Sequence, residues 1–356
     1  MSEHPRFAGS AEESAARIVC RTELERAGFN CVDVPFEFSQ WPGRWGPPLA
    51  AVFQLATILV VARTAIAAGP LSAILAGAAL FTILFFINAD AKRRWIVGLR
   101  FQRARSVNLE ARRGNPTVWL IAHLDSKSQT VPMLVRIASS VALAAIACFA
   151  AVILVLSALG VASGSSVWSG VQLATAIAAL PAIFCFVRND STGGVDNASG
   201  VVAVLLASQS SAVRDLGVLL TSGEELGLAG ARIWTAARVR EDDRSRSMRV
   251  LNCDTVDEAG DWRSMYTGTK PKGIATAVES VADRLGVPLA MRRLIPGILA
   301  DSMAFADRGI EAVTLSRGTL STLARIHTRR DNSNALTGQG AAEASVLLSA
   351  LAKELS

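Results

Sequence analysis

Four long apolar blocks limit what this chain can fold into. They cover Leu49–Ala68, Pro70–Asn88, Ile137–Val161 and Val167–Val187, and within them only Arg63 carries a charge. A helix needs about 20 apolar residues to cross a bilayer, and an arginine a turn or two from a helix end can reach the interface. Because of these blocks, the hydrophobic fraction of 51% is high for a water-soluble enzyme. They predict two transmembrane hairpins, with four spanning helices in all.

The distribution of charge predicts which side of the membrane the other segments occupy. If all four blocks span, residues 1–48, 89–136 and 188–356 share one side, and they carry nearly all of the 36 Lys and Arg residues. A basic segment from Lys92 to Arg113 directly follows the second block. Since positively charged segments stay in the cytoplasm, we expect an integral protein of the cytoplasmic membrane with its soluble parts facing the cytoplasm.

Cysteines, charge and the N-terminus support this location. The five cysteines are scattered and form no CxxC pair, which agrees with a reducing compartment. The N-terminal residues contain no apolar segment typical of a cleavable signal peptide. The net charge of +6 is not accompanied by interleaved aromatic residues, so nucleic-acid binding is not expected.

Outside the apolar blocks, the sequence alternates between helix and strand patterns. We expect five segments: a first fragment of a soluble domain (1–47), hairpin 1 (48–89), a second fragment (90–131), hairpin 2 (132–187) and the main part of the soluble domain (188–356). Helices are expected at 10–26, 201–207 and 274–285 and from about 337 to the end, and strands at 31–38, 106–111, 117–122, 216–220, 248–253 and 312–315.

Three carboxylates between residues 189 and 231 fall in two compact clusters. Asp196 lies in a glycine-flanked turn before an apolar run, and Glu224 and Glu225 follow the expected strand at 216–220. An Asp before a helix is most often an N-cap, and paired Glu residues usually complement the helix dipole. However, ligands of open α/β sheets bind at the carboxyl ends of strands, where one acid can bind a metal while its neighbour transfers protons.

Two of the three histidines follow strand-like or apolar stretches. His123 comes after the expected strand at 117–122, and His327 precedes the closing helix; the third, His4, lies in the N-terminal tail. A single His at a strand end is usually structural. Together with Asp196, Glu224, Glu225 and Asp254, however, the two histidines form a mixed nitrogen and oxygen donor set that suits zinc.

The ordered motifs resemble those of metallopeptidase family 28, the dinuclear zinc aminopeptidases and glutamate-carboxypeptidase-like enzymes, with glutaminyl cyclases as relatives. The resemblance rests on His123-x-Asp125, Asp196-Asn197-Ala198-Ser199-Gly200, Glu224-Glu225-x-Gly227-Leu228-x-Gly230, Asp254 and Arg325-Ile326-His327-Thr328. It covers the chain from about Ser106 onward, and 10–38 fits the family's first helix and strand. It implies an α/β three-layer sandwich around a mixed, mostly parallel twisted sheet, here interrupted by two transmembrane hairpins.

The resemblance also implies a role for each site residue. Asp196 would bridge two zinc ions, with His123 and Asp254 completing one metal site and Glu225 and His327 the other. Glu224 would be the general base for a metal-activated water, and Asp125 would hold the His123 ring in its metal-binding tautomer. The implied activity is a membrane-anchored zinc peptidase of the aminopeptidase type that hydrolyses a peptide or amide bond.

Several features differ from the family or leave alternatives open. Ser302 follows Asp301 where the family often has His, and Tyr266, the only tyrosine, could reach an oxyanion but more often such a residue simply packs. The short connectors at 126–136 and 188–195 span at most about 25 to 40 Å, so the substrate is expected at the bilayer surface. The alternatives are a glutaminyl cyclase-like enzyme, another amidohydrolase or deacylase, a catalytically silent scaffold, or a transporter.

Overall fold

The chain divides into two compact units, each built from segments far apart in the sequence. The computed structural model describes residues 3–90, 98–161, 164–241, 247–295 and 297–356. The sheet unit comprises Met1–Phe38, Gln102–Ser128 and Arg188–Ser356, and the helical unit comprises Ser39–Phe101 and Gln129–Val187. The basic residues Lys92, Arg93 and Arg94 lie outside the described ranges.

The sheet unit contains an eight-stranded mixed sheet with the order β1-β2-β6-β3-β7-β10-β8-β9. Its four central strands, β6, β3, β7 and β10, run parallel to one another. β2 is antiparallel to β6, and β8 is antiparallel to β10. The strands are β1 (Asn30–Ser39), β2 (Arg103–Arg113), β3 (Val118–His123), β6 (Leu216–Thr221), β7 (Arg249–Val256), β8 (Asp261–Tyr266), β9 (Ala290–Arg293) and β10 (Glu311–Gly318).

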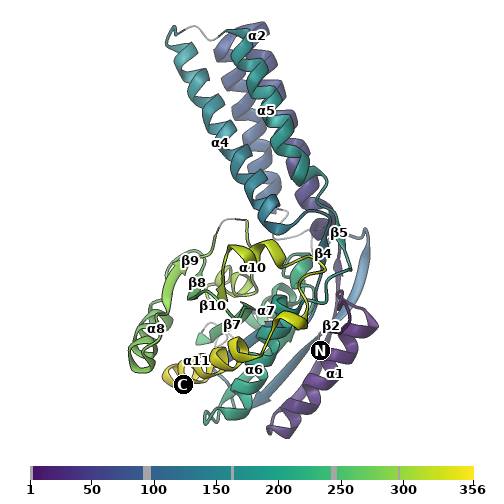
Figure 1. The fold of residues 1–356 in the computed structure, drawn as a ribbon, viewed down its shortest axis with the longest axis vertical. Helices are drawn as coiled ribbons and strands as arrows, with labels where there is room; N and C mark the ends of the chain where they lie inside the picture. Colours follow the sequence, from purple (N-terminus) through teal and green to yellow (C-terminus); the bar gives the residue numbers. More distant parts are fainter. Residues whose placement is uncertain (1–2, 91–97, 162–163, 242–246, 296) are drawn as a thin grey trace. The chain divides into compact units, whose positions relative to one another are not determined.

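Helices cover both faces of this sheet (Figure 1). Side chains alternate along β3, so Leu120 belongs to one core cluster and Ile121 to the other. The first cluster also contains Leu348, and the second contains Trp234 and Phe305. The helices are α1 (Ala11–Arg26), α6 (Ser199–Ser210), α7 (Ala229–Glu241), α8 (Lys272–Leu285), α9 (Ser302–Ala306), α10 (Leu320–Arg325) and α11 (Gln339–Leu355). A mixed sheet between two helical layers is the expected α/β architecture.

The expected helices and strands of the sheet unit are confirmed, with shifts at their ends. Ser10 caps α1 by accepting a hydrogen bond from the Glu13 amide, as its sequence pattern predicts. Asp254 lies inside β7 and not beyond its end. Sequence analysis missed β8, where charged residues interrupt the apolar alternation that indicates a strand, and β9, whose sequence Ala290–Arg293 has no such alternation.

The helical unit consists of α2 (Trp41–Asp90), α4 (Met133–Ala158) and α5 (Ser165–Ile183) (Figure 1). The two blocks expected at 49–68 and 70–88 form one element that starts earlier, at Trp41, and is broken at Gly69, where φ is 83°. The break has a local cause, since Pro70 disfavours a helical conformation in the residue before it. Two short strands pair with each other: β4 (Ser128–Gln129), which precedes α4 in the sequence, and β5 (Val187–Arg188), which follows α5.

By length and composition, three helices of the described chain could cross a membrane. They are Trp41–Ile83, Met133–Ala158 and Ser165–Ile183. Much of their apolar surface faces outward, including Leu71, Phe81 and Leu173. A smaller apolar cluster, which includes Trp168 and residues of all three helices, packs them together. Exposed apolar helices of this length are typical of membrane segments.

Candidate metal centre

The parallel strands bring the ends of distant segments to one edge of the sheet. His123 is the last residue of β3 and is in register with Thr221, the last residue of β6. β6 leads through Gly223, whose positive φ of 70° suits glycine, into the turn η3 (Glu224–Leu226). Asp254 comes near the end of β7, the other neighbour of β3. Ligands of open α/β sheets bind at this edge.

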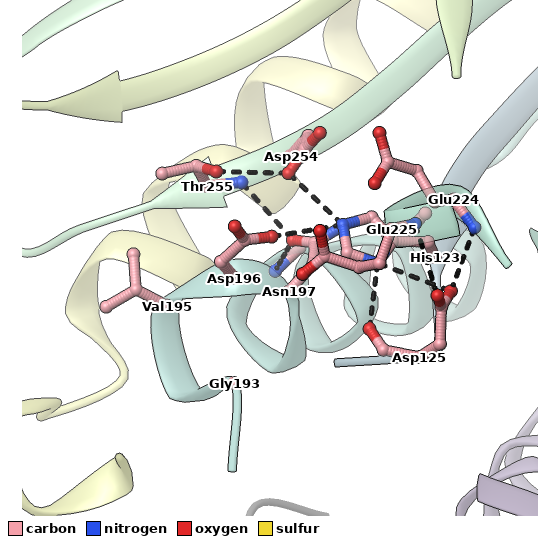
Figure 2. Close-up of polar contacts among 12 residues, drawn as sticks. His123, Asp125, Gly193, Val195, Asp196, Asn197, Glu224, Glu225, Asp254 and Thr255 are labelled. Carbon is pink, nitrogen blue, oxygen red and sulfur yellow. Dashed lines mark hydrogen bonds and ion pairs between the residues drawn. The ribbon is translucent and has the colours of Figure 1, made fainter. Parts of the chain in front are cut away.

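The His123 ring is fixed on one side and faces carboxylates on the other. Its Nδ1 lies 2.9 Å from the carbonyl oxygen of Asp125, which can only accept, so the proton is assigned to Nδ1. Its Nε2 lies 3.1 Å from Asp196 Oδ1 and 3.5 Å from Asp254 Oδ1. Figure 2 shows the carboxylates of Asp196 and Asp254 on the opposite side of the ring from Asp125. The other ring nitrogen, Nε2, therefore faces the oxygens of two carboxylates.

Asp196 lies between the two histidines. Its Oδ1 faces His123, and its Oδ2 lies 3.0 Å from Nε2 of His327. The turn that carries it, η2 (Gly194–Ala198), is held to β7 by Asn197, whose Nδ2 donates to the Cys253 carbonyl at 2.8 Å. The peptide bond between Asp196 and Asn197 is cis. One carboxylate thus presents a different oxygen to each side of the site.

Close packing behind this turn requires a glycine. A Cβ at Gly200 would lie 2.1 Å from Asn197 Oδ1 and 2.4 Å from the Cys253 carbonyl oxygen. Both distances are far below van der Waals contact. Gly200, the second residue of α6 and the last of the DNASG motif, therefore allows the helix to approach Asn197 and β7 closely.

Glu225 and His327 complete the other side of the site. Glu225 Oε2 lies 3.1 Å from His327 Nε2 and 2.7 Å from Nζ of Lys127. Glu225 Oε1 is buried and has no hydrogen-bond partner among the described residues. His327 lies between α10 and the C-terminal helix with a positive φ of 60°.

The five side chains expected as metal ligands come together as two groups that share Asp196. His123, Asp196 and Asp254 form one group, and Asp196, Glu225 and His327 form the other. Within each group, one ligand atom from each residue lies within 4.8 Å of the others, and all five residues are buried. Each group supplies one imidazole nitrogen and two carboxylate oxygens, a donor set that zinc accepts.

Asp125 contacts both His123 and the paired glutamates, but by different atoms. Its carbonyl oxygen, and not its carboxylate, makes the shorter contact with His123, since the Oδ1 distance to Nδ1 is 3.7 Å. The carboxylate accepts hydrogen bonds from the amides of Glu224 and Glu225, at 3.2 Å each (Figure 2). Asp125 therefore orients the ring and fixes the turn that carries both glutamates.

Glu224 is buried among other charged groups. Burial raises the pKa of its carboxyl well above the usual value; His123 opposes this effect, and the nearby carboxylates of Glu225 and Asp254 add to it. For Asp196, burial favours the neutral acid, but its close contacts with the His123 and His327 rings hold its pKa far below the usual value. The two acids differ because Asp196 contacts both imidazoles directly.

The same carboxylates shift the pKa of the His123 ring. Burial alone would lower the pKa of His123, but the carboxylates of Glu224, Asp125, Asp196 and Asp254 outweigh it and raise this pKa well above the usual value. Such concentrated negative charge in a buried position favours binding a cation.

Asp301, Ser302 and Tyr266, to which sequence analysis gave no defined role, have specific contacts. Asp301 is buried and accepts a hydrogen bond from Thr221; burial, with help from Asp125 and Asp254, raises its pKa to about 7. Ser302 contacts Thr314 at 2.7 Å, on the strand beside β7. Tyr266 is half-buried and packs against the larger core cluster.

Three supporting residues were missed by sequence analysis. Arg6, only 2% exposed, donates to the carbonyl oxygens of Leu124, directly after His123, and of Gly193, directly before the turn that carries Asp196. Asp331 accepts from the amide of Asp196 at 3.3 Å, and Lys127 contacts Glu225. Asp331 lies four residues beyond His327 and Lys127 two beyond Asp125, so proximity to a motif was the only available signal.

Fold and site together define an α/β protein with a candidate metal centre at the carboxyl edge of its sheet. The chain belongs to peptidase family M28, since the model of that family matches residues 106–352, more than half of the sequence. No curated protein matches the sequence significantly.

Solved structures share the fold at low sequence identity. An aminopeptidase from Aneurinibacillus sp. strain AM-1 is 14% identical with a TM-score of 0.56, and the match covers 98% of this chain and 90% of that one. A zinc aminopeptidase from Bacillus subtilis is 12% identical with a TM-score of 0.52 and the same coverage. A glutaminyl cyclase from Fimbriiglobus ruber is 12% identical with a TM-score of 0.52, covering 99% of this chain and 90% of that one.

Proposed function

We propose that this M28 peptidase is a membrane-anchored, zinc-dependent hydrolase of the aminopeptidase type that cleaves a peptide or amide bond. The observation that carries the proposal is the pair of buried donor groups that share Asp196. Solved structures of the same fold include zinc aminopeptidases, which supports both the metal and the reaction.

The donor atoms fit two zinc ions. His123 Nε2 and Glu225 Oε1 are buried without a hydrogen-bond partner in the described part of the chain. Buried charges are usually paired or coordinate a metal, and here four carboxylates, those of Asp196, Glu224, Glu225 and Asp254, share one site. His123, Asp196 and Asp254 would hold one ion, and Asp196, Glu225 and His327 the other. Bound zinc would lower the pKa of a water and polarise the scissile carbonyl.

Glu224 is the proposed general base. It directly precedes Glu225 in the chain, its amide donates to Asp125, and it belongs to neither of the two donor groups found among the described residues. Its ionised form would be favoured by zinc ions held beside it, and this carboxylate would accept the proton of the attacking water and deliver it to the nitrogen of the leaving amine. Asp125 would act as a positioning residue for both His123 and Glu224.

A glutaminyl cyclase-like reaction is the second candidate, because a cyclase is among the structures with this fold. A mononuclear catalytic site needs three protein ligands and an open position. This chain has two complete three-residue groups, so hydrolysis with two ions is the better supported reaction.

Membrane anchoring is proposed from the apolar helices. Three helices reach the length and composition of membrane spans, and the break at Gly69 divides the first of them, which supports four crossings. The Lys and Arg residues concentrate outside these helices, so the sheet unit would face the cytoplasm.

Covalent connections would keep the site close to the bilayer. Between Asp125 and the start of α4 at Met133, the connector 126–132 spans at most about 25 Å when fully extended. The proposed substrate is therefore a peptide, an amide or an acylated compound presented at the membrane surface.

Hydrolysis of aminoacyl and acyl-amide substrates by the purified full-length protein tests the function. The reaction should stop on treatment with a chelator and return on addition of zinc. Hydrolysis that is insensitive to a chelator would overturn the proposed metal mechanism. Equal rates on soluble substrates with and without lipid would remove the support for surface presentation.

A further inference from the structure

Lys127 contacts one of the two candidate metal groups. Its Nζ lies 2.7 Å from Oε2 of Glu225 and 2.9 Å from the carbonyl oxygen of the same residue. The side chain is only 11% exposed, so the ammonium is largely withdrawn from water. Glu225 Oε2 is also the oxygen that faces His327 Nε2. Lys127 therefore shares an oxygen with the donor group formed by Asp196, Glu225 and His327.

The other donor group has a different electrostatic environment. His123 contacts the carboxylates of Asp196 and Asp254, which belong to its own group, and that of Asp125. The carboxylate of Asp254 also accepts a hydrogen bond from the hydroxyl of Thr255, which is neutral. The two groups supply the same kinds of ligand atom, so the ammonium on Glu225 is a marked asymmetry between them.

An ammonium on a metal-ligating carboxylate weakens that ligand in two ways. It neutralises part of the negative charge that attracts a divalent cation, and it repels the cation directly. In a largely buried site this repulsion is screened less than at the surface. A hydrogen bond from a neutral donor, such as the one from Thr255 to Asp254, has no comparable repulsion.

We propose that Lys127 lowers the affinity of the Asp196, Glu225 and His327 group for its zinc ion, so that the two positions fill in order. The first ion binds His123, Asp196 and Asp254, and the second binds only at higher zinc concentration. The second ion either displaces the ammonium from Oε2 or uses Oε1, which has no partner among the residues described here. This inference rests on the proposed function, since it assumes that both groups bind zinc.

Zinc titration of the metal-free full-length protein, followed calorimetrically, tests the inference. The wild-type chain should show two separate binding steps. Lys127→Met and Lys127→Gln remove the charge, and Gln retains a donor for the Glu225 carbonyl. In both variants the second step should tighten by about tenfold or more while the first changes little. Lys127→Arg should restore the weak second step, because it keeps the charge.

A matched control and the contrary outcomes make the test decisive. Lys353→Met removes one exposed positive charge at the end of α11 and should leave both steps unchanged. Thermal unfolding of each metal-free variant identifies chains that fail to fold. A second step that is unchanged or weaker in both uncharged variants overturns the inference alone. A wild-type chain that binds no zinc overturns the proposed function as well.

Discussion

Ionisable side chains are buried together in the sheet unit, whereas apolar side chains are exposed along the helical unit. In the sheet unit, His123, Asp196 and Glu225 are almost inaccessible to solvent. In the helical unit, Phe81 and Leu173 have more than half of their surface exposed. Burying a charge without a partner costs several kcal/mol, and leaving a large apolar side chain in water forgoes about 1.5–3 kcal/mol. Each unit therefore points to a partner outside the chain.

The two missing partners differ in kind. In the sheet unit, nitrogen and oxygen donors converge on small volumes, which suits a cation. In the helical unit, the exposed apolar surface extends along whole helices, which suits the hydrocarbon of a bilayer. Chemistry and location can therefore be tested separately, each on its own unit of the chain.

Glu224→Gln should produce the largest change, and it should affect the sheet unit alone. The amide cannot accept the proton of the attacking water, so kcat should fall by about 10²–10⁴-fold. Zinc content should remain at the wild-type level, because Glu224 belongs to neither donor group. Turnover is measured on aminoacyl amides and zinc by elemental analysis. If kcat stays within a factor of two of wild type, Glu224 is not the base.

Leu173→Arg should disturb the helical unit without affecting the chemistry. Leu173 lies in the middle of α5 and is 64% exposed, so an Arg there would face lipid at a cost of about 2.5–3.5 kcal/mol on the insertion scale. The fraction that resists carbonate extraction from membranes should fall. Leu320→Arg is the matched control, since Leu320 on α10 of the sheet unit is 71% exposed. Equal extraction of the two variants would contradict a bilayer around α5.

An effect on stability, and not on activity, is expected from pH acting on Glu13, a buried carboxyl of the sheet unit. Burial, with a contribution from Asp125, raises the pKa of Glu13 from 4.5 to about 8. Between these values the unfolded chain releases a proton that the folded chain retains. Stability should therefore fall as pH rises from about 5 to 8, by up to about 1.4 kcal/mol per pH unit.

Glu13→Gln should remove this part of the pH dependence. The Gln oxygen can still accept the hydrogen bonds that Glu13 receives from the Gly9 amide and the Ser106 hydroxyl. Denaturant unfolding of wild type and variant at pH 5, 6, 7 and 8 gives the difference. Parallel pH profiles for the two proteins would mean that the Glu13 carboxyl titrates normally in the fold.

Much of the fold could be predicted because the central strands have simple patterns. The strands β3 and β6 are short apolar runs whose residues are all buried, and His123 and the paired glutamates lie at or just after their ends. From the positions of these residues in the sequence, one could therefore predict that they lie at the same edge of a parallel sheet. Asp196 could be placed near them through the turn that precedes a helix.

Other contacts depend on features that a linear pattern does not contain. Lys127 contacts Glu225, which lies 98 residues away in the sequence, and Asp331 contacts Asp196, which lies 135 residues away. Whether Asp125 orients His123 through its carbonyl or its carboxylate depends on the local loop conformation. β9, with two arginines among its four residues, carries no apolar alternation to identify it. Sequence could therefore identify the donor residues but not their supporting contacts.

The zinc content of purified wild-type protein and of Asp196→Asn tests the central claim most directly. Asp196 faces both histidines, so it is the one side chain common to the two donor groups. Elemental analysis should find about two zinc ions per wild-type chain and loss of both from a variant that remains folded. A folded Asp196→Asn variant that keeps the wild-type zinc content, or a wild-type chain that binds none, would contradict the shared metal centre.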